Sequence, residues 1–457
     1  MSSAAGRTGA DPGHGPGGGS APTGQGGGSA STEGTARAGT ARASETPDRT
    51  PEDGRAGGPR AALGAAHGAA HGVAAKAPTG ASGSSSDPSR SSAGSSGAPG
   101  GSAAAAEDPS GLEPTRLDTD TGARRVFRAQ VTALCERWLG SDAVGFAFPG
   151  GTRRDSCRVT LADGRSLIAT IRDEPDRADL ETRVLGALAP HEAPAPRVLA
   201  ANRRVLMQED CGETRLSVAL HHADPTEAER LLDDALGSLV ALQEAGARAG
   251  LEERVPLLGV AGWWIESLID RPVALGSLLG LQPPVPEIEH LRDLLTVAEP
   301  RFVKWDARPA NAVIDADGHV VWIDFEHCGA RNPLDDVAWL LADEFVPHDP
   351  ERDERLLAAH LPRFGGSLPA PLLPHYARAM IVLHGAHRLN LMMDGHGGED
   401  GRGWRDAERC VRRDSVGVTL EFALRQCDRL AHHAAQSSLT GALAPFFLEC
   451  RERIAAL

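Results

Sequence analysis

The sequence predicts an α+β protein in which a small antiparallel sheet precedes a larger helical part, with a low-complexity tail before both. Three observations support this. Small residues dominate the first 110 positions. Short strand-like runs, two of them joined by a turn signal, follow up to residue 208, and after that apolar side chains repeat at helical spacing. We therefore divide the 457-residue chain into a tail at 1–115, a first lobe at 124–210 and a second lobe at 211–457.

The tail lacks the side chains needed to build a core. Residues 1–110 contain 78 Gly, Ala, Ser or Pro and no Phe, Trp or Tyr. Burial of so few apolar groups cannot offset the ~1–2 kcal/mol that ordering each residue costs, so we expect a disordered tail. The tail is nearly neutral, whereas residues 111–457 carry a net charge of −14. This charge argues against nucleic acid as a partner and favours a cationic ligand.

Targeting signals and disulfide patterns are not evident. Residues 1–20 are polar and glycine-rich, unlike a signal peptide, and no apolar run reaches the length of a membrane span. We expect a cytoplasmic protein without membrane contact, and its oligomeric state stays open. The seven cysteines are scattered, odd in number and without a C-x-x-C pair, which predicts reduced, mostly buried thiols.

The first lobe is predicted from apolar spacing and one strong turn signal. The Asp-Gly pair at 163–164 joins two apolar runs, which is typical of a β-hairpin. The helices are predicted from apolar residues at helical spacing. The predicted elements are a helix at 126–139, strands at 144–148, 157–161 and 166–171, a helix at 179–188, and strands at 197–199 and 205–208.

The second lobe is predicted to be mainly helical. A stripe of leucines and alanines between 231 and 242 follows a helix start at Pro225. A second Asp-Gly pair, at 317–318, predicts another hairpin. The predicted elements are the helix from Pro225, a short helix near Trp263, a helix at 288–297, strands at 312–314 and 319–323, and helices at 376–393, 410–427 and 444–454.

The residues most informative about chemistry lie around this second hairpin. Asp306 is followed five residues later by Asn311, and Asp324 comes at the end of the second hairpin strand. Phosphoryl transfer from ATP requires one carboxylate to accept or orient the proton of the attacking hydroxyl, and oxygen ligands to hold Mg²⁺ on the phosphates. The D-x-x-x-x-N spacing and the strand-end aspartate match the corresponding positions of a kinase.

At these positions the sequence resembles the aminoglycoside phosphotransferase and choline kinase-like family of the protein kinase-like fold. The family pattern H-G-D-x-x-x-x-N, I-D-[WF]-E and D-[LVI]-A corresponds to residues 304–311, 323–326 and 336–338. The resemblance extends from about residue 125 to the end of the chain and implies a two-lobed kinase-like fold. It implies these roles: Asp306 as catalytic base or orienting group, Asn311 and Asp324 as Mg²⁺ ligands, and Asp336 as an acid bracing the catalytic loop.

The resemblance also implies a strand lysine that contacts the ATP phosphates and meets a glutamate on the next helix. Glu181 fits the helix acid, but the strand at 166–171 has no lysine, and Arg172 is the cation available there. Strict alternation places Arg172 on the face opposite to Ala169, which we expect to face adenine. A phosphate contact from Arg172 would then require a bulge or a strand-end twist.

Two alternatives to Arg172 as the phosphate contact therefore stay open. Arg172 could be an exposed strand end, with the charge supplied by Lys304 or Arg158 instead. The other nucleotide-binding candidates come from a glycine-rich turn between strands, where backbone amides can approach phosphates, and from the segment joining the lobes. These candidates are Gly150, Gly151, Gln208, Glu209 and Asp210.

Acidic and aromatic residues of the second lobe suggest a cationic acceptor. Trp263 and Trp264, close to Glu266 and Asp270, could line a pocket for an ammonium group, although core packing with a solvated face is the favoured explanation. The acidic pair at 343–344 and the acidic residues at 394–400 could add negative potential.

We predict a phosphotransferase that uses ATP and Mg²⁺ to phosphorylate a hydroxyl of a small acceptor, such as an aminoglycoside or an amino alcohol. Lys304 and Trp305 replace the His-Gly pair of the family, so the acceptor stays open. The alternative is a catalytically impaired nucleotide-binding pseudoenzyme or regulatory module, because the strand lysine is also missing. A protein-substrate kinase is disfavoured, because no Ala-Pro-Glu segment follows Asp324.

Overall fold

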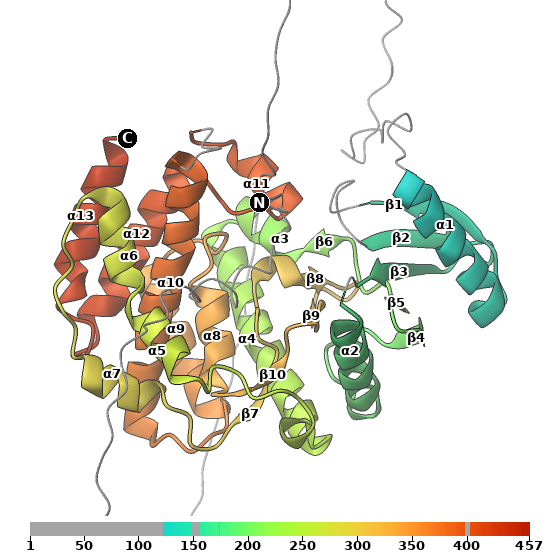
Figure 1. Ribbon diagram of the computed structural model, residues 1–457, viewed down its shortest axis with the longest axis horizontal. Coiled ribbons are helices and arrows are strands. Elements are labelled where there is room, and N and C mark those ends of the chain that lie inside the picture. The colour runs from blue at the N-terminus through green and yellow to red at the C-terminus, as the bar shows by residue number, and fades with distance from the viewer. Residues whose placement is uncertain (1–121, 149–155, 173, 398–402) are drawn as a thin grey trace, which may run out of the picture. The chain divides into compact units, whose positions relative to one another are not determined.

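The computed structural model describes residues 122–148, 156–172, 174–397 and 403–457 (Figure 1). All of them belong to one unit of the chain, Ala77–Leu457. The tail predicted at 1–115 and the glycines at 150–151 lie outside the described residues. Within the described part, every helix is too short or too polar to cross a membrane. The seven cysteines are unpaired and six of them are buried, as predicted.

The first lobe contains a five-stranded antiparallel sheet with the strand order β1-β2-β3-β5-β4. The strands are β1 (Ala143–Ala147), β2 (Ser156–Leu161), β3 (Ser166–Ile171), β4 (Val198–Ala201) and β5 (Val205–Glu209). The predicted hairpin of β2 and β3 is confirmed. Its turn depends on Gly164, whose φ of 86° lies in the left-handed region that glycine adopts without steric cost.

Helix α1 (Gly122–Leu134) continues through a π-helical turn at Cys135–Leu139 and covers one face of the sheet (Figure 1). Phe127, Val131 and Cys135 pack there against the alternate strand residues that point the same way. Those strand residues are Cys157, Val159, Leu161, Leu167, Ala169, Val205 and Met207. The residues between them, including Arg158, Thr170 and Gln208, therefore belong to the opposite face.

Helix α2 (Pro175–Leu188) lies between β3 and β4 in the chain and connects the sheet to the helical part. Its apolar residues Leu180, Val184, Leu185 and Leu188 are buried in the same cluster as residues of the long helix α4 (Pro225–Arg248). Because α2 packs against both parts, Glu181 on its buried side can reach groups that belong to the helical part.

The rest of the chain is mainly helical with three short strand pairings. Its strands are β6 (Thr214–Arg215), β7 (Arg301–Val303), β8 (Ala312–Ile314), β9 (Val320–Trp322) and β10 (Gly329–Arg331). Its other helices are α3 (Leu216–His222), α5 (Gly262–Ile269), α6 (Arg271–Leu279), α7 (Ile288–Leu295), α8 (Leu334–Leu341), α9 (Pro350–His360), α10 (Leu373–Gly397), α11 (Ala407–Arg413), α12 (Leu420–Ala435) and α13 (Leu443–Ala455).

Most predicted elements of this part are confirmed. The apolar stripe predicted behind Pro225 is buried along α4, which begins where Asp224 accepts a hydrogen bond from the Glu227 amide. The predicted hairpin is β8 and β9, paired from Ala312 opposite Trp322. Helix α10 contributes to both hydrophobic cores of the helical part, so it is apolar around most of its circumference.

One prediction was wrong in detail. The single helix expected at 410–427 is two helices, because α11 ends at Asp414 with a φ of 46° and Thr419 accepts a hydrogen bond from the Phe422 amide to start α12. Near Trp263, Pro272 lies in the first turn of α6. Proline suits that turn because its missing N–H would have no partner there.

The strand pairings of the helical part position the segment around Asp306. β7 pairs with β10, and β8 lies between β6 and β9. The segment from Lys304 to Asn311 connects β7 to β8, while Asp324 lies two residues after the end of β9. Strands β6, β7 and β10 were not predicted, because two or three residues are too few to show a strand periodicity.

Candidate active site

The backbone of the predicted catalytic loop is strained at two adjacent residues. Trp305 and Asp306 both have a φ of 50°, and Asp324 has a φ of 64°. They are three of the five non-glycine residues with positive φ in the described residues. Such conformations cost about 1–3 kcal/mol each and persist only where surrounding contacts enforce them. The contacts of this loop therefore show what the fold holds in place.

Asp336, in the first turn of α8, supplies the main restraint. Its Oδ2 accepts a hydrogen bond from the Lys304 amide at 2.9 Å, and its Oδ1 accepts one from the Trp305 amide at 2.8 Å. The Gln243 side chain also donates to Oδ2. Complete burial raises the pKa of Asp336 to about 6, although all three hydrogen bonds oppose this shift. These contacts support the bracing role that the resemblance implies.

Asn311 orients the side chain of Asp306. Its Nδ2 donates to the Asp306 carboxylate at 2.8 Å and to the Asp306 main-chain oxygen at 3.0 Å. Both hydrogen bonds use the amide nitrogen, so Asn311 can offer its amide oxygen to another group. One Asp306 carboxylate oxygen is fixed by this contact. The loop thus presents a carboxylate in a defined orientation, as proton acceptance requires.

The structure brings Arg172, Glu181 and Asp324 together. Arg172 donates from Nε and Nη2 to Glu181 Oε2 at 2.9 and 2.8 Å, and from Nη2 to Asp324 Oδ1 at 2.6 Å. Glu326 lies 3.3 Å from the same guanidinium. Glu181 in turn accepts the Phe325 amide at 3.0 Å. One cation therefore joins the sheet, helix α2 and the segment that follows β9.

The charges of this cluster perturb one another strongly. Burial raises the pKa of Asp324, but the positive charges of Arg172 and Lys304 outweigh it and lower the pKa to about 2. Burial also raises the pKa of Glu181, and Arg172 offsets only part of that increase. Burial lowers the pKa of Arg172, but the neighbouring carboxylates raise it by a larger amount. The net shift is upward, so the guanidinium stays charged.

The expectation that Ala169 faces adenine is wrong. Ala169 is fully buried between the sheet and α1, so the other face of β3, with Thr170, is the one that faces Glu181 and Asp324. β3 pairs with β5 in regular register as far as Ile171, and no bulge is needed. Arg172 reaches Glu181 by simple alternation. The exposed strand-end alternative is also wrong, because the Arg172 side chain is only 14% exposed.

The two alternative cations have other partners. Arg158 donates from Nη2 to Asp210 at 2.8 Å and also contacts Glu213, so its charge is engaged with the segment after β5. Lys304 is completely buried and donates from Nζ to the main-chain oxygen of Asp324 at 2.6 Å. Lys304 therefore connects the loop of Asp306 to the strand-end aspartate, a contact that the sequence did not predict.

The three candidates between the lobes differ in their surroundings. Gln208 is buried on the face of the sheet that carries Thr170, and its Oε1 has no hydrogen-bond partner among the described residues. The Glu209 carboxylate accepts the Arg197 amide at 3.1 Å. Asp210 is held by Arg158 and by the Ser166 hydroxyl. Gln208 thus has an unused acceptor, whereas Glu209 and Asp210 are engaged with neighbouring strands.

The donor atoms of Asn311 and Asp324 fit a magnesium ion. Asn311 offers its amide oxygen, and Asp324 has one carboxylate oxygen engaged by Arg172 and a second one remaining. Mg²⁺ prefers hard oxygen ligands, usually takes one or two from protein side chains, and keeps several waters. The chemistry of the two side chains therefore matches the role that the resemblance implies.

A buried cluster of ion pairs lies next to the loop, and the sequence did not predict it. Arg308 is 2.6 Å from Asp343, 3.8 Å from Glu344 and 3.7 Å from Asp414, and Glu344 also binds Arg388. Asp343 and Glu344 are therefore buried and each paired with an arginine, and the idea that the pair at 343–344 adds negative potential for an acceptor is wrong. Arg308 had no recognisable motif, and its partners lie far away in the sequence.

The tryptophans have partners within the chain. The guanidinium of Arg331 lies 4.2 Å from the ring of Trp264, so the cation on that indole is the protein's own, while Trp263 is 54% exposed. Trp305, next to Asp306, has its ring 5.8 Å from that of Trp264 and 5.5 Å from that of Trp339. These aromatic rings line the loop on the side of α5 and α8.

A sheet lobe, a helical lobe and a cation joining a helix acid to a strand-end aspartate define a phosphotransferase of kinase-like architecture. A family model confirms this class: it matches residues 146–380, just over half of the chain. The chain belongs to the phosphotransferase enzyme family. The predicted family resemblance, the two-lobed fold and the phosphotransferase class are thereby confirmed, whereas the roles of individual site residues and the lobe boundary at 210 remain predictions.

Three solved structures illustrate what the chain is similar to. Macrolide 2'-phosphotransferase MphH from Brachybacterium faecium is 17% identical, with 63% of this chain and 97% of that chain covered and a TM-score of 0.42. Aminoglycoside phosphotransferase APH(3'')-Id from Streptomyces rimosus, in complex with ADP and streptomycin, is 18% identical, with 56% and 97% covered and a TM-score of 0.36. Choline kinase LicA from Streptococcus pneumoniae is 13% identical, with 68% and 99% covered and a TM-score of 0.40. Comparison with curated proteins finds no match.

Proposed function

We propose that the protein transfers the γ-phosphoryl group of ATP to a hydroxyl group of a small molecule, in the presence of Mg²⁺. The observation that carries this proposal is the cluster of Arg172, Glu181 and Asp324, in which one half-buried guanidinium meets both a helix acid and the predicted metal ligand. Nucleotide phosphates are multiply charged, and a guanidinium held by carboxylates is well suited to bind them.

Asp306 accepts the proton of the attacking hydroxyl in this proposal. The hydroxyl oxygen forms a bond to the γ-phosphorus, the bond from that phosphorus to the β–γ bridging oxygen breaks, and ADP leaves with the electron pair. The proton of the hydroxyl passes to the Asp306 carboxylate, which Asn311 and the strained backbone hold in place. Asp336 acts as a positioning residue, because it contacts the loop backbone rather than the reacting atoms.

Asn311 and Asp324 would hold the magnesium ion through their oxygen atoms. When bound, the ion neutralises charge on the phosphate oxygens. In the described structure Arg172 binds Asp324 Oδ1, and a nucleotide phosphate offers this guanidinium a competing acceptor. Glu181 keeps the Arg172 side chain in place through two hydrogen bonds. An arginine therefore takes the position where the family has a strand lysine.

This arrangement removes the main reason for the pseudoenzyme alternative. That alternative rested on the missing strand lysine and the altered His-Gly pair. Arg172 supplies a half-buried cation at the strand end, and the Lys304 side chain links the loop to Asp324. Nothing in the described residues favours loss of turnover, so we propose an active enzyme.

For the acceptor we propose a small hydroxyl compound, with aminoglycosides and amino alcohols to be tested first. The net charge of −14 over residues 111–457 supports a cationic compound through its long-range potential. This support comes from the overall charge and not from Asp343 and Glu344, because arginines compensate the charges of those two residues. Incubation of the enzyme with ATP, Mg²⁺ and a mixed library, followed by mass spectrometry, would identify any compound that gains one phosphoryl group.

The decisive variant is Asp306→Asn, with Asp317→Asn as its control. Asp317 is an exposed aspartate in the turn of the β8–β9 hairpin, so its substitution tests the same chemical change away from the loop. We expect Asp306→Asn to reduce transfer to the identified acceptor by about 10²-fold or more and to leave ATP affinity nearly unchanged. Transfer by Asp306→Asn at the rate of Asp317→Asn would exclude Asp306 as the base.

A further inference from the structure

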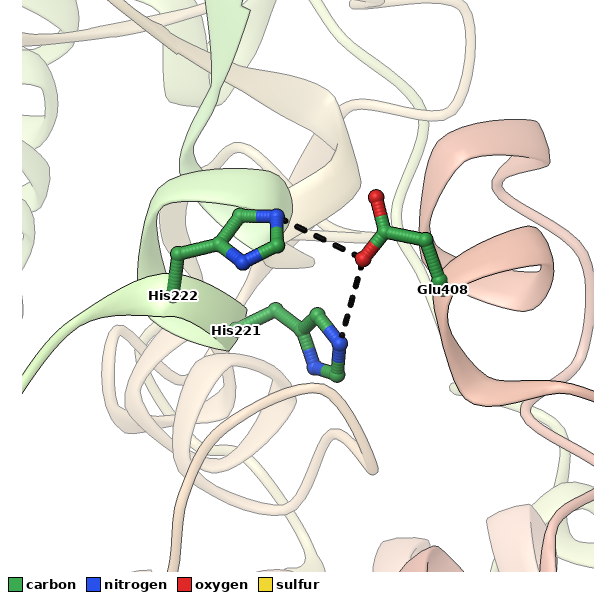
Figure 2. A group of neighbouring side chains, drawn as sticks. All are labelled: His221, His222 and Glu408. Carbon is green, nitrogen blue, oxygen red and sulfur yellow. Dashed lines mark ion pairs between the residues drawn. The ribbon is translucent and has the colours of Figure 1, made fainter.

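A cluster of two histidines and one glutamate lies at the contact of helices α3 and α11. His221 and His222 end α3, and Glu408 lies in the first turn of α11 (Figure 2). The Nε2 atoms of both histidines lie 3.4 Å from the same atom, Glu408 Oε2. All three ligand atoms lie within 4.8 Å of one another. Nothing in the proposed phosphotransfer uses these residues.

These distances suit a shared metal ion better than hydrogen bonds. An N–H···O bond has a donor–acceptor distance of about 2.7–3.2 Å, and neither histidine comes that close to Glu408. In a tetrahedral zinc site, bonds of about 2.0–2.1 Å place neighbouring ligand atoms about 3.3 Å apart. Two of the three ligand separations, at 3.4 Å, are close to this value, and the third is at most 4.8 Å.

The neighbours of the cluster keep its ligands oriented. Arg412 Nε donates to Glu408 Oε1 at 2.5 Å, which leaves Oε2 directed at the histidines, as Figure 2 shows. The His221 ring packs edge-on against Phe422, with ring centroids 6.1 Å apart. Ligands that are held in this way by a second layer of contacts bind metal more tightly than freely rotating ones. The His222 ring is 58% exposed, so an ion and a coordinated water can approach from solvent.

We propose that His221, His222 and Glu408 form a binding site for a divalent transition metal ion, with Zn²⁺ as the best match. Two imidazole nitrogens and one carboxylate oxygen are ligands that zinc prefers, whereas Mg²⁺ prefers oxygen ligands alone. Water completes the fourth position. The ion would tie α11 to α3, and α3 contacts the turn at Pro309–Asn311 that carries Asn311.

A second cluster with similar residue types is a weaker candidate. Glu354, His432 and His433 also lie within 4.8 Å of one another. His433 is fully buried, and its Nε2 lies 3.8 Å from Asp353, so a hydrated ion cannot approach it from solvent. Arg378 also donates to Glu354. This cluster is therefore better explained as buried packing than as a metal site.

The test measures zinc binding to the full-length, untagged chain by calorimetry in excess Mg²⁺. Residues 1–121 contain further histidines, so the informative quantity is the difference between the wild type and variants. We expect one zinc ion per chain to lose affinity by more than about tenfold in His222→Ala and in Glu408→Gln, because each removes a ligand. The control His319→Ala removes an exposed histidine that pairs with Asp234, away from the cluster, and it should bind zinc like the wild type.

A second readout does not depend on calorimetry. Zn²⁺ should raise the melting temperature of the wild type and of His319→Ala, because an ion that binds only the folded state stabilises it, but not that of His222→Ala or Glu408→Gln. Co²⁺ in place of Zn²⁺ should give the visible absorption of a tetrahedral site in the wild type and in His319→Ala, but not in His222→Ala or Glu408→Gln. Equal zinc affinity in the wild type, His222→Ala and Glu408→Gln would overturn the proposal.

Discussion

Substitution of Asp336 by alanine should lower the stability of the protein and also release the backbone of its catalytic loop. The variant leaves the Lys304 and Trp305 amides without their acceptor, whereas the Gln243 side chain keeps its hydrogen bond to the Pro333 main-chain oxygen. At about 1–3 kcal/mol for each of the two unsatisfied amides, the gross cost is about 4 kcal/mol. Part of this cost is offset, because raising the pKa of Asp336 from 3.8 to about 6 corresponds to about 3 kcal/mol at neutral pH, which alanine recovers. We expect a net loss of about 1 kcal/mol in the free energy of unfolding.

Asp335→Ala is a matched control on the same helix. Asp335 is equally buried and carries the same charge, but it binds Arg331 at 2.6 Å and the Tyr376 hydroxyl at 2.7 Å instead of the loop. Removing it leaves a buried arginine without its partner, which typically costs about 3–5 kcal/mol. Asp335→Ala should therefore lose at least as much stability as Asp336→Ala, but only Asp336→Ala should release the loop.

Two measurements separate the variants. Hydrogen exchange of the Lys304 and Trp305 amides should become faster in Asp336→Ala than in Asp335→Ala at equal temperature below unfolding. The left-handed backbone at Trp305 and Asp306 then relaxes, so kcat for phosphoryl transfer should fall by about 10²-fold in Asp336→Ala and change little in Asp335→Ala. Equal loss of kcat in both variants would show that Asp336 acts through global stability, and the bracing argument would then be wrong.

Three further outcomes follow from particular contacts. Arg172→Lys keeps a cation at the strand end and should retain Mg²⁺–ATP binding, whereas Arg172→Met should weaken it by more than about tenfold in calorimetry; equal affinity of the two variants would contradict a phosphate contact. The pKa of Asp336 is higher in the folded state, so its stabilising contribution is complete below its unfolded value of 3.8 and is lost as the pH rises through about 6. Relative to Asp336→Asn, the wild type should lose about 3 kcal/mol of unfolding free energy between about pH 4 and 7 in urea titrations, and a constant difference would refute this. A Cβ on Gly246 would lie 2.3 Å from the Phe302 ring, whereas one on Gly237 would meet nothing nearer than 3.9 Å, so Gly246→Ala should lower the melting temperature and Gly237→Ala should raise it.

The sequence predicted those features that depend on neighbours along the chain. The β2–β3 and β8–β9 hairpins follow from Asp-Gly turns between apolar runs, and the buried stripe of α4 follows from apolar residues at helical spacing. The order of Asp306, Asn311 and Asp324 was enough to indicate phosphoryl transfer, and the family match confirms that class. In each of these cases the physical cause acts within a few residues, so it can be seen in a linear pattern.

The tertiary structure decided which groups those residues meet. Arg172 binds Glu181 and Asp324 because α1 covers the Ala169 side of the sheet and leaves the other side to face them. Alternation along β3 specifies only that neighbouring residues point in opposite directions, not which face α1 covers.

The same limit applies to the loop, the ion pairs and the histidines. The strained backbone at Trp305 exists because Asp336 lies beside it, and His221 meets Glu408 because α11 packs against α3. A charged or strained group is stabilised by whatever lies within a few ångströms of it. In this protein those partners are separated by tens to hundreds of residues, so their identity is a property of the folded chain and not of any local pattern.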